Sequence, residues 1–566
     1  MGIRDSRGLD LALSLVADGT ATPDHVRTVL EELMRSRTLV LDEVIARSRR
    51  QSAGDERAAM LQRRVAEAAN VLVGLLVRGP GKDGPERYRR DLAEAHERMD
   101  AAERAVAEQH ASRPDHGAEP PLARLQEALP PGSALLAFAR YSHQPLQSLA
   151  ATGGVPSYLA FIVSRGGAPA VLPLGPAAAI EDAVRAWQAE VARAPGRDRA
   201  GADAAEAACR VAGERLRAAI WDPLIGQVGD ARSVFVVPEG VLHLVHLDAL
   251  PRTGGGYLIE ALPAIHQLTA EKDLLVAPRG SRRGVGLLAM GGARFDLPVA
   301  VGRPTAASAS VVRATPAGPV CPEFQRIRFA PLPQTGSEVK EIARVFERSA
   351  AGIASQQAAA VLRGSQATES AFRRLAPGKR ILHLATHGFF LGEGCRAVEP
   401  AARGIGGLVS TAEPISPRTT GDTTLRLAGL ALAGANQRDT AASPADDGIL
   451  TAEEIAVLDL DGVEWAVLSA CESGAGTVAI GEGVLGLRRA FLIAGARSVI
   501  MSLWAADDAA ARAWMNALYR ARLEHGLSTA EAVREAGLQV LQTRRLEGLS
   551  THPFYWAGFV AAGDWR

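Results

Sequence analysis

Short apolar runs typical of buried strands alternate with longer helical patterns over most of this sequence. The strand-like runs lie at 134–141, 158–164, 233–238, 284–290, 379–386, 464–470 and 497–503, and the helical patterns at 178–194, 202–220, 337–346 and 482–494. Apolar runs without regular polar alternation are typical of strands covered on both faces, as in parallel sheets. The order strand, helix, strand over 464–503 also predicts a right-handed parallel crossover. The pattern therefore predicts an α/β fold.

The length of the chain predicts more than one domain. Its 566 residues exceed what a single hydrophobic core usually organises. We expect an α-helical region over 1–130, where apolar residues such as Val26 and Leu30 recur at helical spacing. An α/β domain is predicted over 131–280, and a second one over 281–566.

Two segments between the predicted elements are rich in small residues and proline, at 298–322 and 392–447. An irregular segment as long as the second is uncommon inside an ordered domain, and is more often functional than idle. We therefore expect 392–447 to be a loop that gates a neighbouring site. Just after it, Thr451 and Glu454 have the spacing of a capping box, which predicts the start of a short helix.

Charge and cysteine usage narrow the classes of partner and compartment. Lys and Arg together number 63, as do Asp and Glu, so no net field draws the chain toward nucleic acid or a membrane surface. The cysteines Cys209, Cys321, Cys395 and Cys471 form no CxxC pair, which argues against a disulfide framework or a zinc ribbon. The start of the chain has no apolar secretory core, and the apolar run 71–77 is too short to span a membrane. We therefore expect a cytoplasmic protein that binds neither nucleic acid nor membrane.

Two residues that can carry chemistry follow predicted strands. His387 comes directly after one strand and Cys471 directly after another, and α/β proteins place nucleophiles and ligands at the carboxyl ends of their strands. A thiolate activated by a neighbouring imidazole needs no metal. Gly388 lacks a Cβ, so its backbone N–H can approach a substrate oxygen and form an oxyanion hole with that of Cys471. The alternative is that both are ordinary buried residues, which spacing alone leaves open.

Two other kinds of site compete with this dyad. His383, His387 and Cys395 are a conceivable metal set, although His383 lies inside an apolar strand and a fourth ligand is missing. Residues 474–479, GAGTVA, fit the loose GxGxxA form of a dinucleotide-binding loop. Against that interpretation, 480–483 separate the glycines from the rest of the next helical pattern, and no acidic residue ends the following strand. We therefore expect neither a metal nor a cofactor.

Several segments together resemble one protein family. ILHLATHG at 381–388, VLSACESG at 467–474 and GEGVLGLRRAF at 481–491 are similar to the CHAT domain, a family of caspase- and separase-like peptidases often attached to tetratricopeptide repeats. The resemblance continues through LAGLALAGAN at 427–436, AGARSVIMSLW at 494–504 and HPFYW at 552–556. It covers about residues 135–566.

The resemblance implies a fold, an activity and a set of site residues. The fold is a caspase-like α/β/α sandwich preceded by a pseudo-caspase-like α/β domain and the N-terminal helical region, itself similar to a repeat-bearing sensor arm. The activity is that of a cysteine endopeptidase that cleaves a protein substrate and answers to an activating or sensing protein partner. The catalytic histidine of the family falls on His387 and its nucleophile on Cys471. Asp508, Asp507 and Trp504 resemble positions that bind substrate, although an acid at a helix N-terminus also suits the helix dipole.

Two other functions stay open at this point. The same sandwich can serve as a signalling scaffold in which the dyad is vestigial, although the intact Cys471 and His387 weigh against it. A nucleotide-binding α/β protein would need phosphate-sized space at 474–483. A protease instead needs the Cys471 sulfur and the His387 ring in one open cleft.

Overall fold

A computed structural model describes the chain over residues 4–50, 122–144, 154–196, 198–228, 231–261, 264–275, 283–297, 327–355, 359–390, 428–440, 446–469, 478–479, 483–484, 486–504 and 506–566, with isolated positions between 60 and 105. Cys395 and Cys471 lie outside the described residues. Among the helices in these ranges, none is long and apolar enough to cross a membrane.

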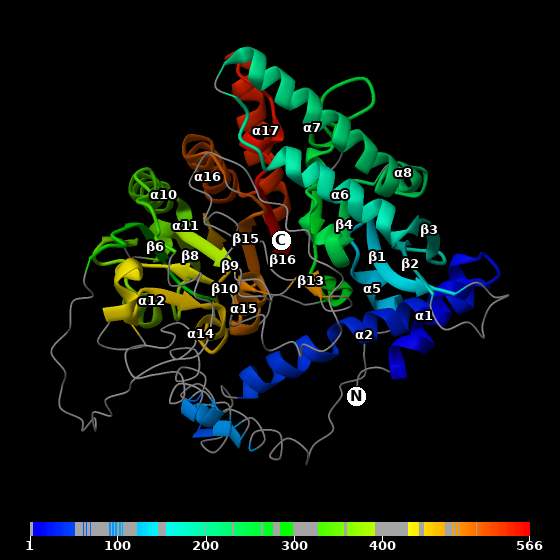
Figure 1. The fold of residues 1–566 in the computed structure, drawn as a ribbon, viewed down its shortest axis with the longest axis horizontal. Coiled ribbons are helices and arrows are strands. Elements are labelled where there is room, and N and C mark those ends of the chain that lie inside the picture. Colours follow the sequence, from blue (N-terminus) through cyan, green and yellow to red (C-terminus); the bar gives the residue numbers. More distant parts are fainter. Residues whose placement is uncertain are drawn as a thin grey trace.

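One mixed sheet of 11 strands runs through the molecule (Figure 1). Its strands lie in the order β3-β2-β1-β4-β5-β16-β15-β12-β8-β6-β7. Their bounds are β1 Ser133–His143, β2 Val155–Ser164, β3 Ala170–Pro176, β4 Ser233–Val237, β5 Ala264–Gln267, β6 Leu287–Ala293, β7 Ala360–Gly364, β8 Ile381–Ala385, β12 Trp465–Leu468, β15 Ser498–Ser502 and β16 Phe559–Gly563. The α/β fold predicted from the apolar runs is confirmed.

The sheet is continuous across the two predicted α/β domains. Strands β1 to β5 form one half, and β6, β7, β8, β12, β15 and β16 form the other. The halves meet where β16 runs parallel to β5, with Ala562 opposite Gln267. Strand β16, which the sequence pattern did not predict, is antiparallel to β15 on its other side. The boundary near residue 280 thus falls between two halves of one sheet, and the division into two domains stays a prediction.

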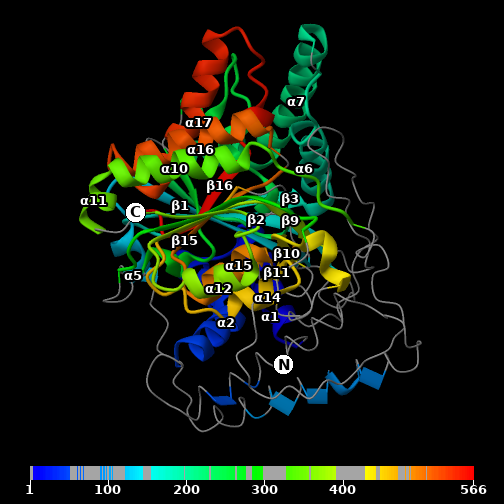
Figure 2. The same cartoon turned by 90° about the vertical axis from the view of Figure 1, so that its left-hand side faces the viewer.

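Helices cover both faces of the second half of the sheet, which explains why its central strands are largely apolar. Figure 2 shows α10 (Thr335–Arg348), α16 (Asp508–Leu523) and α17 (Thr529–Leu546) on one face, and α12 (Glu369–Leu375) and α15 (Leu487–Ala494) on the other. Every residue of β8 and β12 is buried, as expected for strands packed on both sides. Strands β12 and β15 are parallel, as predicted. The predicted α/β/α sandwich is confirmed.

Two helices from the N-terminal region pack on the first half of the sheet. Helices α1 (Arg4–Ala17) and α2 (Pro23–Arg50) bury apolar residues such as Leu13 and Leu30 in one cluster with residues of β1 and β2. The isolated described positions between 60 and 105 are also helical. The described helices of the region 1–130 are thus Arg4–Ala17, Pro23–Arg50 and Leu122–Ala128, and its extent as a separate region stays a prediction.

A buried arginine fastens α2 to the sheet. Arg37 donates a hydrogen bond to Glu239, with 3.2 Å between Nε and Oε2, and others to the carboxylate of Glu271 and the carbonyl of Phe138. Both carboxylates are buried with the guanidinium. A buried charge that loses its partner is strongly destabilising, so these bonds fix the position of α2.

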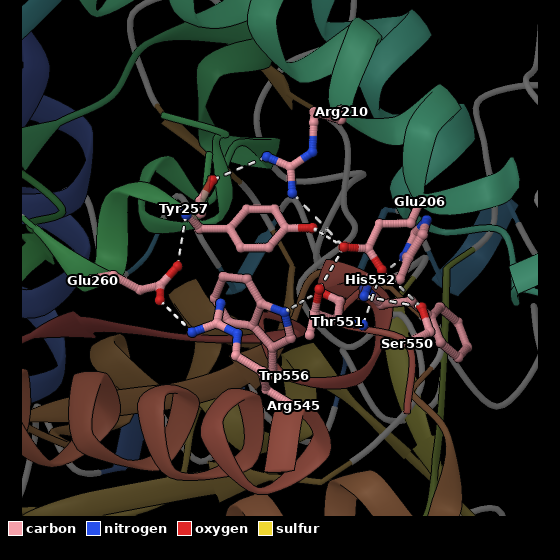
Figure 3. A network of polar contacts seen from close by, with 11 residues as sticks. Glu206, Arg210, Tyr257, Glu260, Arg545, Ser550, Thr551, His552 and Trp556 are labelled. Carbon is pink, nitrogen blue, oxygen red and sulfur yellow. Dashed lines mark hydrogen bonds and ion pairs between the residues drawn. The ribbon is translucent and has the colours of Figure 1, made fainter. Parts of the chain in front are cut away.

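A polar cluster joins α7 to the chain that leads into β16 (Figure 3). Glu206 on α7 (Arg199–Ile220) accepts hydrogen bonds from the hydroxyls of Tyr257, Ser550 and Thr551, and from the backbone N–H of Thr551. The distances are 3.2 Å to Tyr257, 3.0 Å to Ser550 and 2.9 Å to the Thr551 nitrogen. Hydrogen bonds to a carboxylate are stronger than those between neutral groups. The side chain of Glu206, from the first half, therefore holds the segment that precedes β16, the strand at which the two halves of the sheet meet.

Part of the predicted loop 392–447 is regular structure, so that prediction is wrong for those residues. Residues Ala428–Ala431 form β10, which pairs on one side with β9 (His387–Phe390) and on the other with β11 (Ile449–Thr451). A short 3-10 helix, η7 (Ala435–Thr440), follows it. Three of the four residues of β10 are alanine or glycine and all four are buried, and so short a run gives no clear periodicity. Much of the rest of the segment lies outside the described residues.

Helix α15 starts later than the sequence pattern predicts. It spans Leu487–Ala494 rather than 482–494, and Val478–Ala479 pairs with Gly483–Val484 in a small hairpin, β13 and β14. Gly486 precedes the helix with a φ of 117°, a backbone conformation that favours glycine. A hairpin and this glycine therefore stand between the glycine-rich segment and the helix. A dinucleotide-binding loop would instead open directly into its helix.

Candidate active site

Strands β8 and β12 end side by side, and each leads to a predicted catalytic residue. They are parallel neighbours, with Leu384 opposite Leu468, and the backbone N–H of Ser469 donates to the carbonyl of Leu384 at 2.9 Å. His387 begins β9 just after β8. Cys471 follows Ser469 closely in the sequence and lies outside the described residues. The described chain thus leads from both strands to one edge of the sheet.

The ring of His387 is buried among aromatic side chains and contacts a backbone carbonyl. The residue is only 4% exposed. Its Nε2 lies 2.7 Å from the carbonyl oxygen of Ala330. The ring centroid lies 5.3 Å from that of Phe295 and 5.7 Å from that of Phe329. These contacts restrict the orientation of the imidazole.

The carbonyl partner decides which nitrogen of the neutral His387 ring carries the proton. A carbonyl oxygen only accepts hydrogen bonds, so Nε2 donates to Ala330. Nδ1 then carries the lone pair, which is what an imidazole needs to take a proton from another group. His387 is therefore oriented to act as a base through Nδ1.

His383 has a different environment, although it lies on the same stretch of chain. It is fully buried, with Nε2 2.9 Å from Oε1 of Glu338 on α10 and Nδ1 3.1 Å from the hydroxyl of Tyr519 on α16. Both of its ring nitrogens have side-chain partners on one helical layer. In the part of the chain that the structure describes, no three His, Cys, Asp or Glu side chains gather as metal ligands. The structure thus gives no support to the set of His383, His387 and Cys395, the last of which lies outside the described residues.

Gly388 is buried inside β9, opposite Leu430 of β10. The chain between β8 and β9 is held against β10, because the hydroxyl of Thr386 donates a hydrogen bond to the carbonyl of Ala431. The predicted second donor to the oxyanion, the backbone N–H of Cys471, lies outside the described residues. The oxyanion hole therefore stays a prediction.

Trp504 is buried just after β15 and contacts an aromatic ring from a helix of the first half. Its indole N–H donates to the carbonyl of Phe554 at 3.4 Å. Its ring meets that of Trp187 edge-on, with the centroids 6.0 Å apart, and Trp187 belongs to α6 (Ala177–Val191) of the first half. The described contacts of Trp504 are thus packing contacts, and its role in substrate binding stays a prediction.

Asp507 and Asp508 lie at the start of α16. The carboxylate of Asp507 accepts hydrogen bonds from the backbone N–H groups of Ala509, at 3.1 Å, and Ala510, at 3.0 Å, which makes it the N-cap of the helix. Asp508 is half-buried in the first turn. Asp507 therefore stabilises the N-terminus of α16, which is the alternative role that the sequence left open. A substrate contact by either acid stays a prediction.

The model of one protein family, the CHAT domain, matches residues 210–564. The match spans more than half of the chain and includes both His387 and Cys471. The chain belongs to the CHAT domain family. The resemblance that the sequence motifs indicated is thereby confirmed.

Curated relatives of this CHAT domain protein match it over a short stretch. Tetratricopeptide repeat protein 28 of Homo sapiens is 36% identical over 121 residues, and that of Mus musculus is 35% identical over 121 residues. Each match covers 21% of this chain and 5% of the relative. The likeness is therefore confined to a small part of the length of these proteins.

Solved structures show a distant likeness to the chain. The Saccharomyces cerevisiae separase–securin complex at 3.0 Å gives a TM-score of 0.43 at 8% identity, covering 78% of this chain and 30% of that chain. A chain described as "Structure of Protease" gives a TM-score of 0.33 at 10% identity, covering 69% of this chain and 76% of that chain. The family assignment rests on the CHAT domain match and not on these structures.

The residues around His387 were not found from the CHAT domain motifs. Ala330, Phe295 and Phe329 lie outside every segment that carries the resemblance. Ala330 contributes a backbone carbonyl, which any residue type can provide, so the sequence holds no signal for it. Asn436 ends the LAGLALAGAN segment and accepts a hydrogen bond from the Phe329 N–H at 2.8 Å. That asparagine was the one signal in the motifs that could have led to this part of the site.

Proposed function

We propose that this chain is a cysteine endopeptidase in which His387 and Cys471 form the catalytic dyad. The observation that carries the proposal is the hydrogen bond from Nε2 of His387 to the carbonyl of Ala330 at 2.7 Å. It directs the lone pair to Nδ1, on a ring at the sheet edge where the chain continues from Ser469 toward Cys471. Membership of the CHAT domain family supports the same assignment.

The proposed reaction is peptide hydrolysis through an acyl-enzyme. Nδ1 of His387 takes the proton of the Cys471 thiol, and the thiolate attacks the peptide carbonyl. The backbone N–H groups of Gly388 and Cys471 stabilise the oxyanion. The imidazolium then gives its proton to the leaving amine as the C–N bond breaks. Water, deprotonated by the same imidazole, hydrolyses the thioester and restores the thiol.

The proposed substrate is a protein, and the proposed regulator is an activating or sensing protein partner. The balance of acidic and basic residues, 63 of each, gives no reason to expect direct binding to nucleic acid or membrane. The local likeness to tetratricopeptide repeat protein 28 supports association with a repeat-bearing sensor. For substrate contacts, Asp508 is a stronger candidate than Asp507, which already caps α16, whereas Trp504 is buried in packing contacts.

A catalytically silent signalling scaffold is the alternative that the experiment must exclude. The orientation of the His387 ring favours the enzyme, because a scaffold has no need of a base held in one tautomer. The nucleotide-binding alternative is weakened by the hairpin of β13 and β14 and by the late start of α15.

The test is mass-spectrometric cleavage profiling on a diverse peptide library, with wild type and Cys471→Ala at equal concentration. Cys209→Ala is the matched control, because Cys209 is buried on α7 and its burial raises the pKa of the thiol to about 12. We expect wild type and Cys209→Ala to cut the same peptides and Cys471→Ala to cut none. Cleavage that persists in Cys471→Ala would contradict the proposal. So would an inactive wild type whose Cys471 reacts with alkylating agents as an ordinary thiol.

A further inference from the structure

Asn436 binds the backbone of the segment that holds His387. It lies in η7 and is 7% exposed. Its Oδ1 accepts a hydrogen bond from the N–H of Phe329 at 2.8 Å, and its Nδ2 donates to the carbonyl of Phe329 at 3.0 Å. One side-chain amide therefore satisfies both backbone groups of a single residue.

Phe329 comes directly before Ala330, whose carbonyl contacts His387. Peptide groups are planar, so holding the N–H and the C=O of Phe329 fixes two successive peptide planes. The carbonyl of Ala330, 2.7 Å from Nε2 of His387, belongs to the next plane along the chain. Asn436 thus sets the direction in which the chain enters Ala330.

Asn436 also fastens the second aromatic neighbour of His387. Its backbone N–H donates to the carbonyl of Phe295 at 2.9 Å. Its Nδ2 donates a further hydrogen bond to Oδ1 of Asp296 at 2.7 Å. The amide thereby uses both of its donor hydrogens and its acceptor. Aspartate at this position would lose both donors, and alanine would lose every one of these side-chain bonds.

We propose that Asn436 is a positioning residue for the dyad of His387 and Cys471. It acts through Phe329 and Ala330 and holds the carbonyl that keeps the proton of the imidazole on Nε2. The inference rests on the proposed protease function. Without the amide the carbonyl of Ala330 is less well directed, so fewer His387 rings present Nδ1 in the orientation that takes the thiol proton.

The test is the pH dependence with which iodoacetamide alkylates Cys471 in the full chain, read from its peptide by mass spectrometry. Only the thiolate reacts, so the midpoint of the profile reports how well His387 promotes ionisation of the thiol; we expect a wild-type midpoint well below the ordinary value of about 8.5. Asn436→Ala should raise the midpoint by about one pH unit, which makes alkylation about 10-fold slower below it. His387→Ala should raise it to the ordinary value.

Asn516→Ala is the matched control. Asn516 on α16 also uses its amide in two hydrogen bonds, to Oε2 of Glu341 at 2.8 Å and to the carbonyl of Arg512 at 3.0 Å. Its loss should leave the midpoint unchanged even where the melting temperature falls. If Asn436→Ala does not fold, Asn436→Ser keeps one donor and one acceptor and should show a smaller upward shift.

The outcomes separate the two proposals. A midpoint that rises in His387→Ala but not in the Asn436 variants would overturn the positioning role and leave the dyad standing. A midpoint unchanged in His387→Ala would overturn the dyad, and the positioning role with it. A rise in the Asn436 variants, with Asn516→Ala unchanged, is the result that the positioning role predicts.

Discussion

Two buried histidines on one stretch of chain, His383 and His387, are held in different ways. His383 has a carboxylate at one ring nitrogen and a phenol at the other, both from helices that cover the sheet. His387 gives one nitrogen to a backbone carbonyl and packs against two phenylalanines at the edge of the sheet. Burial and sequence position therefore do not identify a base. The partners do, because they decide whether a nitrogen is directed toward a substrate.

The largest expected difference between variants of the two histidines is in catalysis. His387→Phe keeps an aromatic ring beside Phe295 and Phe329 but has no basic nitrogen. For a peptide that wild type cuts, kcat/KM should fall by about 10²- to 10⁴-fold, the usual contribution of general acid–base catalysis. His383→Phe should leave kcat/KM of the folded protein close to that of wild type. Equal losses in the two variants would erase the distinction between the histidines.

The next largest effect is on the free energy of unfolding, where His383→Phe should have the greater effect of the two variants. His383→Phe should lower the free energy of unfolding by about 3 kcal/mol, because the carboxyl of Glu338 is left buried without its partner. His387→Phe should cost less, because the group it leaves without this partner at Ala330 is a neutral backbone carbonyl rather than a carboxyl. Urea unfolding measures both values. Combining His383→Phe with Glu338→Leu should recover part of the loss, and strictly additive losses would show that the pair does not interact.

His266 is a third buried histidine, and like His387 it has a backbone carbonyl at one ring nitrogen. It lies on β5 with Nε2 2.9 Å from the carbonyl of Gly563. Burial lowers its pKa from 6.5 to about 4, although the bond to Gly563 and the charge of Asp564 oppose the shift. Below pH 6.5 the unfolded chain takes up a proton that the folded ring refuses. The stability that the neutral ring provides is therefore lost as the pH falls from 6.5 toward 4.

Urea unfolding of His266→Gln across this pH range tests that conclusion. Each group of this kind contributes up to about 1.4 kcal/mol per pH unit. Wild type should therefore lose about 2 kcal/mol more than the variant between pH 6.5 and about 5. Burial also lowers the pKa of His552 to about 4. His552 is present in both proteins, so it adds the same dependence of the unfolding free energy on pH to each of them. Parallel curves for the two proteins would contradict the lowered pKa of His266.

The smallest expected effect is that of replacing Asp507. Like His383, this residue has structural hydrogen-bond partners, because it caps α16. Asp507→Ala should destabilise the protein by about 1 kcal/mol through the loss of the N-cap, and Asp507→Ser should restore most of it. Thermal unfolding measures the difference. Neither change should alter which peptides are cut. A changed residue preference in both variants would instead place Asp507 in the substrate pocket.

The regular elements could be predicted because their signals are local. A strand buried on both faces reads as a continuous apolar run, and those runs became β4, β8, β12 and β15 within a few residues of the predicted bounds. The capping box of Thr451 and Glu454 opens α14 (Ala452–Ala456) as predicted. The position of His387 after its strand also followed from the sequence.

The missed features depend on contacts between distant segments. Strand β10 has only four residues, and its conformation is set by pairing with β9 and β11. The carbonyl that orients His387 belongs to Ala330, 57 positions away, and no residue type marks a carbonyl. Asn436 stood inside a recognisable motif, but its partner Phe329 lies 107 positions away. The sequence could therefore propose His387 as a base, but it could not predict the contacts that orient its ring.

The tautomer of His387 is the most direct test of the proposed dyad. In Cys471→Ala, which has no thiol proton to share, nitrogen-15 spectra of histidine-labelled protein at neutral to basic pH distinguish the two ring nitrogens. The signal that disappears when His387→Phe is added identifies the ring. We predict a protonated Nε2, bonded to Ala330, and an unprotonated Nδ1. A proton on Nδ1 would contradict the assignment of His387 as the base of Cys471.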